Sequence, residues 1–369
     1  MKRYNATLLL LACVIAALAN SPYINKVYEY TPAPGQFINT PLSYYEEGDT
    51  YTDVLEKVNT ALINNKLVTL GAYGGYVVVG FDHTIANVVG EYDFKVYGNA
   101  IVNGDGSGSS EPGIVMVSAD TNGDGLPNDE WYEIAGSMHG EESTLKNYRI
   151  TYYRPNPVGS DVQWVDSNGD EGYVPRVSAH AQGSYYPQWT SENTLTFKGS
   201  RLPGNATFEA PHWKLRPFEW GYADNQPNTS EYSNFNIEWA VKKDGSPANL
   251  RGIDFIKIYT GVVQVCGSLG ETSTEVGGIE DLHPDAPISA ENTESSGFAI
   301  YPNPFGEQFS TTSPGNATVT VYNLLGNCVL TQAINAGSTE VDASHLSNGY
   351  YTVHISSAGK SAVFRAVKK

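Results

Sequence analysis

The sequence predicts an all-β protein: a jelly-roll-like β-sandwich with one short N-terminal helix, followed by a small Ig-like β-sandwich. Two observations predict this class. Many short segments alternate apolar and polar residues with a period of two, which is typical of half-buried strands. Between them lie turn-forming residues, within a chain that holds 37 Gly and 20 Pro, whereas helical periodicity is rare.

The N-terminus has the three parts of a secretory signal peptide. Lys2-Arg3 is basic, Leu8 to Leu18 is apolar, and Ala17-Leu18-Ala19 is a small-x-small cleavage site. We therefore assign residues 1–19 to the signal and expect cleavage after Ala19. A competing lipoprotein signal would use Cys13, but the apolar run continues beyond that residue. No later apolar run approaches the roughly 18 residues that a membrane-spanning helix needs.

Residues 20–283 are expected to form the larger domain. Its one clear helix is predicted over Thr52 to Asn64, where apolar residues fall at helical spacing and Thr52 or Asp53 can cap the start. Turns are predicted at Asn103-Gly104, Asn168-Gly169 and Asp244-Gly245. Strands are predicted at Tyr76–Phe81, Asp93–Tyr97, Gly113–Ser118, Tyr148–Tyr153, Thr194–Phe197, Phe235–Val241 and Ile253–Tyr259.

Residues 284–297 are small, polar and acidic, which is the composition of a linker. Residues 298–369 then alternate again, at Val319 and Val321 and from Tyr351 to Ile355. Turns at Gly315-Asn316 and Asn348-Gly349 connect these segments, so a small antiparallel sandwich is expected.

Three ordered motifs in this last segment resemble the C-terminal sorting domain of the type IX secretion system of Bacteroidetes. They are Tyr301-Pro302-Asn303-Pro304, the strand from Val319 to Gly326, and the stretch from Leu346 to Val353 that leads to the basic end Lys368-Lys369. The resemblance implies that the type IX secretion machinery carries the chain across the outer membrane. It also implies attachment to the cell surface, usually after removal of the tail. The other interpretation of this segment is an ordinary adhesion-like domain.

Charge and cysteine content limit the partners of the chain. The net charge is −18, and the segment between the signal and the tail holds 16 basic and 37 acidic residues. Such a segment repels phosphate backbones, so no nucleic-acid partner is expected. Cys266 and Cys328 lie in different predicted domains, and a disulfide framework is therefore excluded.

The segment from Asp120 to Glu130 is the sharpest motif of the larger domain. Its D-x-N-x-D-G spacing places hard oxygen ligands as in a calcium loop, although position twelve is Trp131 and not Glu. We expect a structural Ca²⁺ here, and a hairpin turn without an ion is the alternative. The expected ligands are Asp120, Asn122, Asp124, the carbonyl of Leu126, and Asp129 or Glu130.

Two groups of aromatic residues could form a stacking platform with polar edges for a small ligand. The alternative is that each of these residues belongs to the core of a tyrosine-rich sandwich. The candidate ligand-binding residues are Tyr185, Tyr186, Trp189, Trp213, Trp220, Tyr222, Asp224 and Asn225.

Several stretches of residues 23–283, among them Gly74–His83, Trp220–Asn225 and Gly270–Glu275, resemble a group of Bacteroidetes cell-surface proteins. The resemblance implies a role beside outer-membrane uptake systems, and for some members the surface capture of corrinoids such as cobalamin. Those relatives are usually lipid-anchored, whereas this chain carries a sorting tail.

The sequence favours a non-enzymatic surface protein that captures a corrinoid for an outer-membrane transporter. The alternatives are a glycan-binding or glycan-degrading protein and a structural adhesion component. No local catalytic motif is present, and His83, His139, His180, His212 and His283 have no metal-binding spacing.

Overall fold

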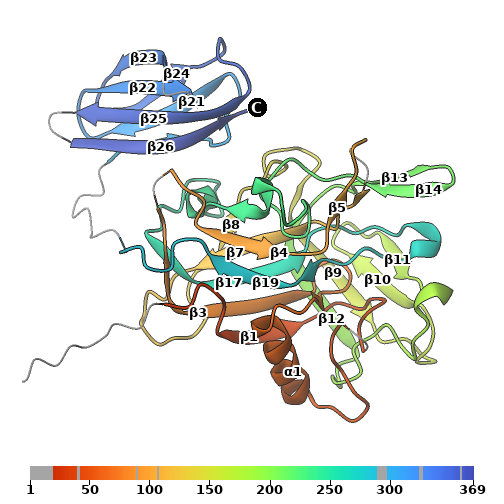
Figure 1. Ribbon diagram of the computed structural model, residues 1–369. Helices are drawn as coiled ribbons and strands as arrows, with labels where there is room; N and C mark the ends of the chain where they lie inside the picture. Colours follow the sequence, from red (N-terminus) through yellow and green to blue (C-terminus); the bar gives the residue numbers. More distant parts are fainter. Residues whose placement is uncertain are drawn as a thin grey trace, which may run out of the picture.

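Two β-rich parts follow one another along the chain, and Figure 1 shows the second as a separate sandwich beside the first. The computed structural model describes residues 20–39, 42–88, 90–105, 108–288, 297–323, 327–357 and 360–369. The predicted signal peptide and most of the predicted linker lie outside the described residues.

The centre of the larger part is a six-stranded sheet that is buried on both faces. Successive apolar side chains of its middle strands point to opposite faces of the sheet. Val115 and Ile258 lie in one core, whereas Ile114 and Tyr259 lie in another. Antiparallel pairing joins neighbours far apart in sequence, such as β17 with β3 and β7. The strands, in sheet order, are β1 (Lys26–Thr31), β3 (Tyr76–Ala86), β17 (Gly252–Thr260), β7 (Gly113–Ser118), β8 (Tyr132–Ile134) and β16 (Ala240–Val241).

On one face, this sheet packs against a small sheet and the helix α1 (Tyr51–Ile63). Val54, Val58 and Leu62 of the helix are fully buried in the shared core. The small sheet contains β15 (Asn234–Phe235), β4 (Phe94–Tyr97) and β19 (Gly278–Asp281), and β2 (Val68–Thr69) pairs with β18 (Glu275–Val276) nearby.

The helix is capped at Thr50, two residues before Thr52 and three before Asp53. Thr50 is the N-cap, and its side chain accepts a hydrogen bond from the backbone N–H of Asp53 while Asp53 accepts one from the N–H of Thr50. This capping box satisfies two N–H groups at once, so Asp53 is the third helical residue and the prediction of Thr52 or Asp53 as the cap was wrong.

On the other face lies a four-stranded sheet whose core is rich in tyrosine. Tyr148, Ile150 and Tyr152 of β9 pack there with Phe197 of β12. The sheet order is β11 (Glu171–Val174), β10 (Val162–Asp166), β9 (Leu145–Tyr153) and β12 (Thr194–Arg201).

A further sheet contains β13 (Ala206–Glu209), β14 (His212–Leu215), β6 (Gly108–Ser109) and β5 (Ile101–Val102). Single-turn 3₁₀ helices lie at Ser178–His180, Glu231–Ser233, Ile237–Trp239 and Gly267–Leu269.

The second part is a sandwich of two antiparallel sheets with its own apolar core. Phe309, Val321, Val353 and Ile355 are among the side chains buried inside it. One sheet holds β20 (Ala299–Tyr301), β21 (Gln308–Ser313) and β24 (Gly337–Asp342); the other holds β23 (Cys328–Ile334), β22 (Ala317–Asn323), β25 (Gly349–Ser357) and β26 (Lys360–Lys368).

The all-β class is therefore confirmed, and the finer expectation of a jelly roll is not. The predicted strand Phe235–Val241 was wrong. Only its ends are strands, because Asn236 accepts a hydrogen bond from the N–H of Glu238 and turns the middle into a 3₁₀ helix.

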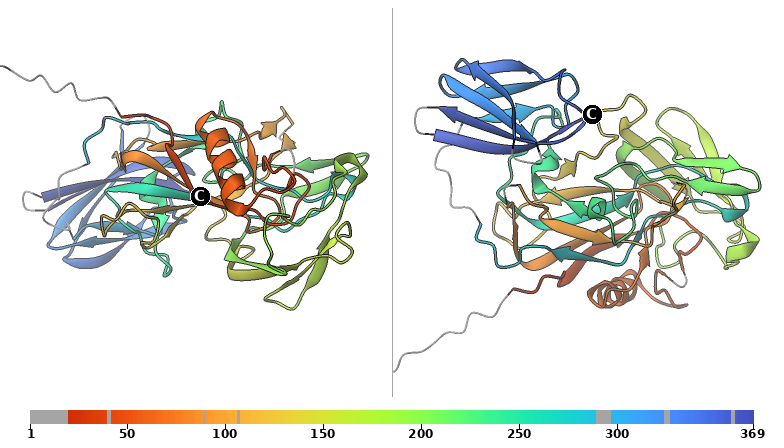
Figure 2. Two further views of the ribbon diagram at one scale, coloured as in Figure 1. Left: turned by 90° about the horizontal axis from the view of Figure 1, so that it is seen from below. Right: turned by 45° about the horizontal axis from the view of Figure 1, so that its top comes forward.

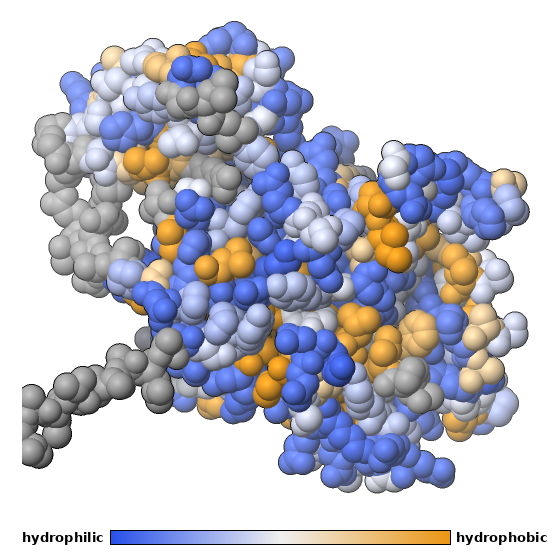
Figure 3. Space-filling model, viewed as in Figure 1, coloured by the Kyte–Doolittle hydropathy of each residue, from blue (hydrophilic) through white to orange (hydrophobic). Residues whose placement is uncertain are grey.

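Cys266 is buried, Cys328 is exposed, and both are free thiols. In the described part of the chain, no helix is both long and apolar enough to cross a membrane. The face seen in Figure 3 is mostly hydrophilic, with apolar side chains in small separate groups.

Candidate functional site

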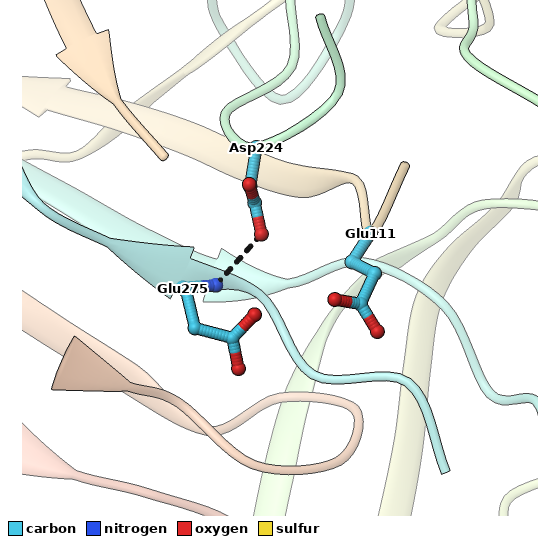
Figure 4. A group of neighbouring side chains, drawn as sticks. All are labelled: Glu111, Asp224 and Glu275. Carbon is cyan, nitrogen blue, oxygen red and sulfur yellow. Dashed lines mark hydrogen bonds between the residues drawn. The ribbon is translucent and has the colours of Figure 1, made fainter. Parts of the chain in front are cut away.

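Three carboxylates from distant segments meet inside the larger part (Figure 4). Glu111 lies just before β7, Asp224 lies in the loop that follows Trp220, and Glu275 begins β18. One oxygen from each lies within 4.8 Å of the others. Asp224 and Glu275 are almost fully buried. We call these three residues the carboxylate cluster.

Asp224 joins the segments that form the cluster. Its Oδ1 accepts hydrogen bonds from the backbone N–H groups of Asn99 (2.7 Å) and Ala100 (2.9 Å). Its Oδ2 accepts one from the N–H of Glu275 at 2.9 Å, drawn in Figure 4. The residue adopts a left-handed backbone with φ of 50°. Asp224 thus holds the backbone at Asn99, Ala100 and Glu275 in place, in addition to contributing a carboxylate to the cluster.

Burial raises the pKa of every member of the cluster. Desolvation and the charge of Glu275 hold the pKa of Glu111 well above its usual range. The same two causes raise the pKa of Asp224, against the opposing effect of its three N–H donors. Burial raises the pKa of Glu275 to about 6, although its Oε1 accepts hydrogen bonds from Ser273 (2.8 Å) and Thr69 (3.2 Å).

A fourth buried acid, Glu271, lies near the cluster in the same segment as Glu275. Its Oε1 accepts a hydrogen bond from the backbone N–H of Gln36 at 2.6 Å. Desolvation raises its pKa to about 8. No ion pair in the described part of the chain involves Glu271 or the cluster. Such a group of acids can hold protons near neutral pH, or it can offer hard oxygen ligands to a divalent cation.

The predicted calcium loop is an exposed turn held by its own side chains. Both oxygens of Asp120 accept backbone N–H groups, from Gly123 at 2.7 Å and from Gly125 at 2.9 Å. Asp124 accepts from the side chain of Asn128, and Asp129 contacts Thr121. Leu126 offers its carbonyl to the N–H of Asn128 at 2.9 Å. Asn122 donates a hydrogen bond to Asp124 within the loop, whereas Glu130 accepts one from the hydroxyl of Tyr132 at the start of β8.

The first aromatic group is split between two cores. Tyr185 and Tyr186 are fully buried, and their hydroxyls donate to the backbone carbonyls of His180 and Glu192. Trp189 is half-buried against Tyr30 and Tyr45 on the other side of the central sheet. These residues therefore do not form the single stacking platform that the sequence suggested.

The second aromatic group is divided in the same way. Trp213 lies in β14 and packs against Phe208, whereas Trp220 packs against Trp239 in the main core. Tyr222 is buried, and its hydroxyl accepts a hydrogen bond from the N–H of Met138 at 3.0 Å.

Asn225 shapes the loop that carries this group. Its side chain is fully buried, accepts a hydrogen bond from the N–H of Phe218 and donates one to the carbonyl of Phe218, both at 2.8 Å. Phe218 stays half-buried at the edge of the fold. We call residues 217–226 the aromatic loop.

A cavity of about 740 Å³ borders the aromatic loop. It is lined by Phe218, Trp220 and Gln226 of the larger part and by Tyr350 and Val367 of the C-terminal sandwich. The volume is that of a typical small-molecule site. Sequence reasoning singled out the loop but not the partners across the cavity.

The acids that meet Asp224 were also missed. Glu275 stands in the Gly270–Glu275 stretch that resembles surface proteins, and Glu111 stands just before the predicted strand Gly113–Ser118, yet no local spacing relates them. Only the pairing of distant strands brings them together.

Comparisons with known proteins identify the C-terminal sandwich. Residues 299–369 match the family described as the secretion system C-terminal sorting domain. No curated protein matches the chain. The chain is thus a cargo of the type IX secretion system, exported across the outer membrane and attached to the cell surface.

Two solved structures show a distant likeness. PorZ, an essential surface component of the type IX system of Porphyromonas gingivalis, is 12% identical with a TM-score of 0.18, and the match covers 83% of this chain and 44% of that one. A β-glucuronidase of Faecalibacterium prausnitzii is 8% identical with a TM-score of 0.17, over 75% of this chain and 47% of that one. The chain thus spans less than half the length of either protein, and TM-scores this low support no inference about fold or function.

Proposed function

We propose that this exported chain is a non-enzymatic binding protein of the cell surface that uses its aromatic loop to capture a small ligand. The observation that carries the proposal is the aromatic loop itself, in which Phe218, Trp220 and Gln226 are among the residues of the larger part that line the cavity of about 740 Å³. Aromatic rings with a few polar groups at their edge suit a large planar or ring-shaped ligand, because stacking supplies area while the polar groups fix orientation.

A corrinoid such as cobalamin is the ligand that we propose first, delivered to an outer-membrane transporter. The support for it is the resemblance of residues 23–283 to surface proteins with that role. A glycan would use the same stacking chemistry, and a protein that binds neither would be a structural component of the surface.

Calorimetric titration with cobalamin tests the proposal, using residues 20–369 after a protease has cut between the two parts and the sandwich has been removed. We expect saturable heat with a Kd in the micromolar range or below. Phe218→Ala should weaken binding at least tenfold, whereas Tyr173→Ala removes an exposed ring of β11 and should leave binding unchanged.

A glycan array and a reducing-sugar assay on the same sample separate the alternatives. Heat from cobalamin that persists unchanged in Phe218→Ala would refute the aromatic loop as the site. An absence of heat at micromolar protein would refute the corrinoid.

A further inference from the structure

The C-terminal sandwich rests on the aromatic loop of the larger part. Val367 of β26 is only 7% exposed, and it belongs to the apolar cluster of the larger part that contains Trp220 and Trp239. Tyr350 of β25 packs against the same cluster. Both side chains project from the outer face of their sheet. Their chain neighbours Tyr351 and Ala366 point to the inner face, into the core of the sandwich.

Polar contacts extend the apolar one. The ammonium group of Lys369 donates to the carbonyl of Ser137 at 2.5 Å and lies 3.4 Å from Glu141. The phenols of Tyr92 and Tyr232 interact with that of Tyr350. Figures 1 and 2 show the C-terminus at the junction between the two parts. A basic chain end thus meets an acidic domain, which is a complementary pairing of charge.

A second cavity continues the junction. It has a volume of about 260 Å³ and is lined by Ile300 and Tyr301 from the sandwich and by Pro247 and Leu250 from the larger part. The two parts therefore meet along an extended face and not at one residue.

We propose that the sorting domain caps the binding face of its own cargo: while attached, it covers the aromatic loop and Tyr232, and its removal uncovers them. The occupant of this face is the sandwich at residues 297–369 of the same chain. What binds afterwards rests on the proposed function, but the cap itself does not. Export and activation are then coupled, since the face opens only once the domain that directs export has left.

The chain offers a variant that separates docking from folding. Val367 packs against the cargo and takes no part in the core of the sandwich, while its backbone N–H and C=O hold Asn303 and Phe305. Val367→Asp should therefore place a carboxylate in the apolar contact without disturbing the sandwich. Ala333→Asp, at an exposed position of β23 in the same sheet, is the matched control.

Hydrogen exchange on residues 20–369 tests the cap without any ligand. We replace residues 289–296 by a protease site and measure the amides of 217–239 before cutting, and again after cutting and separating the sandwich. These amides should exchange at least tenfold faster after cutting, and Val367→Asp should give the same increase in the uncut chain, whereas Ala333→Asp should not.

Equal exchange of these amides before and after removal would overturn the proposal, whatever the variants do. If Val367→Asp unfolds the sandwich, the cut sample alone decides. If hydrogen exchange shows the cap but the protein binds no cobalamin, the proposed ligand is refuted and the proposal of a cap is not.

Discussion

Replacing Glu271 by Gln should make the protein more stable at alkaline pH, because the buried acid must lose a proton there. In the folded protein the pKa of Glu271 is about 8, against 4.5 for an ordinary glutamate, and desolvation is the main cause. The folded state therefore binds more protons than the unfolded state between these values. The contribution of Glu271 to the free energy of unfolding is present below pH 4.5 and is lost as the pH rises through 8.

The size of the effect follows from this shift. It corresponds to at most about 5 kcal/mol at high pH, and relaxation of the site would reduce this to roughly 2 kcal/mol. Gln keeps an oxygen to accept the N–H of Gln36 and carries no charge to desolvate. Its amide also brings a donor to a region where Oε2 of Glu271 and Oε1 of Gln36 lack a partner in the described structure.

Thermal unfolding of the wild type and the variant at pH 5 and pH 8.5 measures the difference. At roughly 2–4 °C per kcal/mol, Glu271→Gln should raise Tm relative to the wild type by about 4–8 °C more at pH 8.5 than at pH 5. Glu142→Gln, at an exposed position, should show no such change. Parallel shifts for Glu271→Gln at both pH values would refute the assignment of a buried, proton-holding carboxyl.

Three further predictions concern the rest of the molecule. Gly98→Ala would place a Cβ 2.4 Å from Oδ1 of Asp224 and should lower the free energy of unfolding by about 1–3 kcal/mol. Gly104→Ala is the control, because its Cβ meets nothing within 4 Å and the change should be nearly neutral. Equal midpoints of urea unfolding for the two variants would contradict this prediction. If the loop at 120–130 binds Ca²⁺, a chelator should lower the Tm of the wild type and not that of an Asp120→Ala, Asp124→Ala double variant, and equal melting with and without chelator would argue against the ion. Deleting residues 298–369 should leave the cargo in the periplasm. Fusing residues 298–369 to a foreign periplasmic protein should send that protein to the surface of a host with type IX secretion. A truncated cargo that still reached the surface would point to lipidation at Cys13.

Local patterns in the sequence located two central strands closely, but they missed several shorter strands and the irregular segments. Period-two alternation located β7 at its actual bounds, Gly113–Ser118, and β17 to within one residue at either end. It failed at Phe235–Val241 because the backbone there is bent by side-chain bonds, including that from the N–H of Ile237 to Asp93 at 2.7 Å. Alternation carries no signal for such bonds.

The candidate site depends still more on distant contacts. Asp224 was identifiable as an unusual polar residue in an aromatic loop, but Glu111 and Glu275 reach it only through the tertiary fold. Tyr185 and Tyr186 were candidates for an exposed platform, and they are buried because their hydroxyls find carbonyl partners inside. A sequence shows that a tyrosine can stack but does not show which face of the fold it occupies.

Ligand affinity before and after loss of the sorting domain tests the central claim most directly. One preparation of residues 20–369 with a protease site in place of 289–296 is titrated with cobalamin, first intact and then after cutting and removal of the sandwich. We expect binding to become at least tenfold tighter on removal, because Tyr350 and Val367 no longer cover the aromatic loop. The same measurable affinity in both states would contradict a binding face that opens when the sorting domain leaves, whereas no heat in either state would refute cobalamin as the ligand.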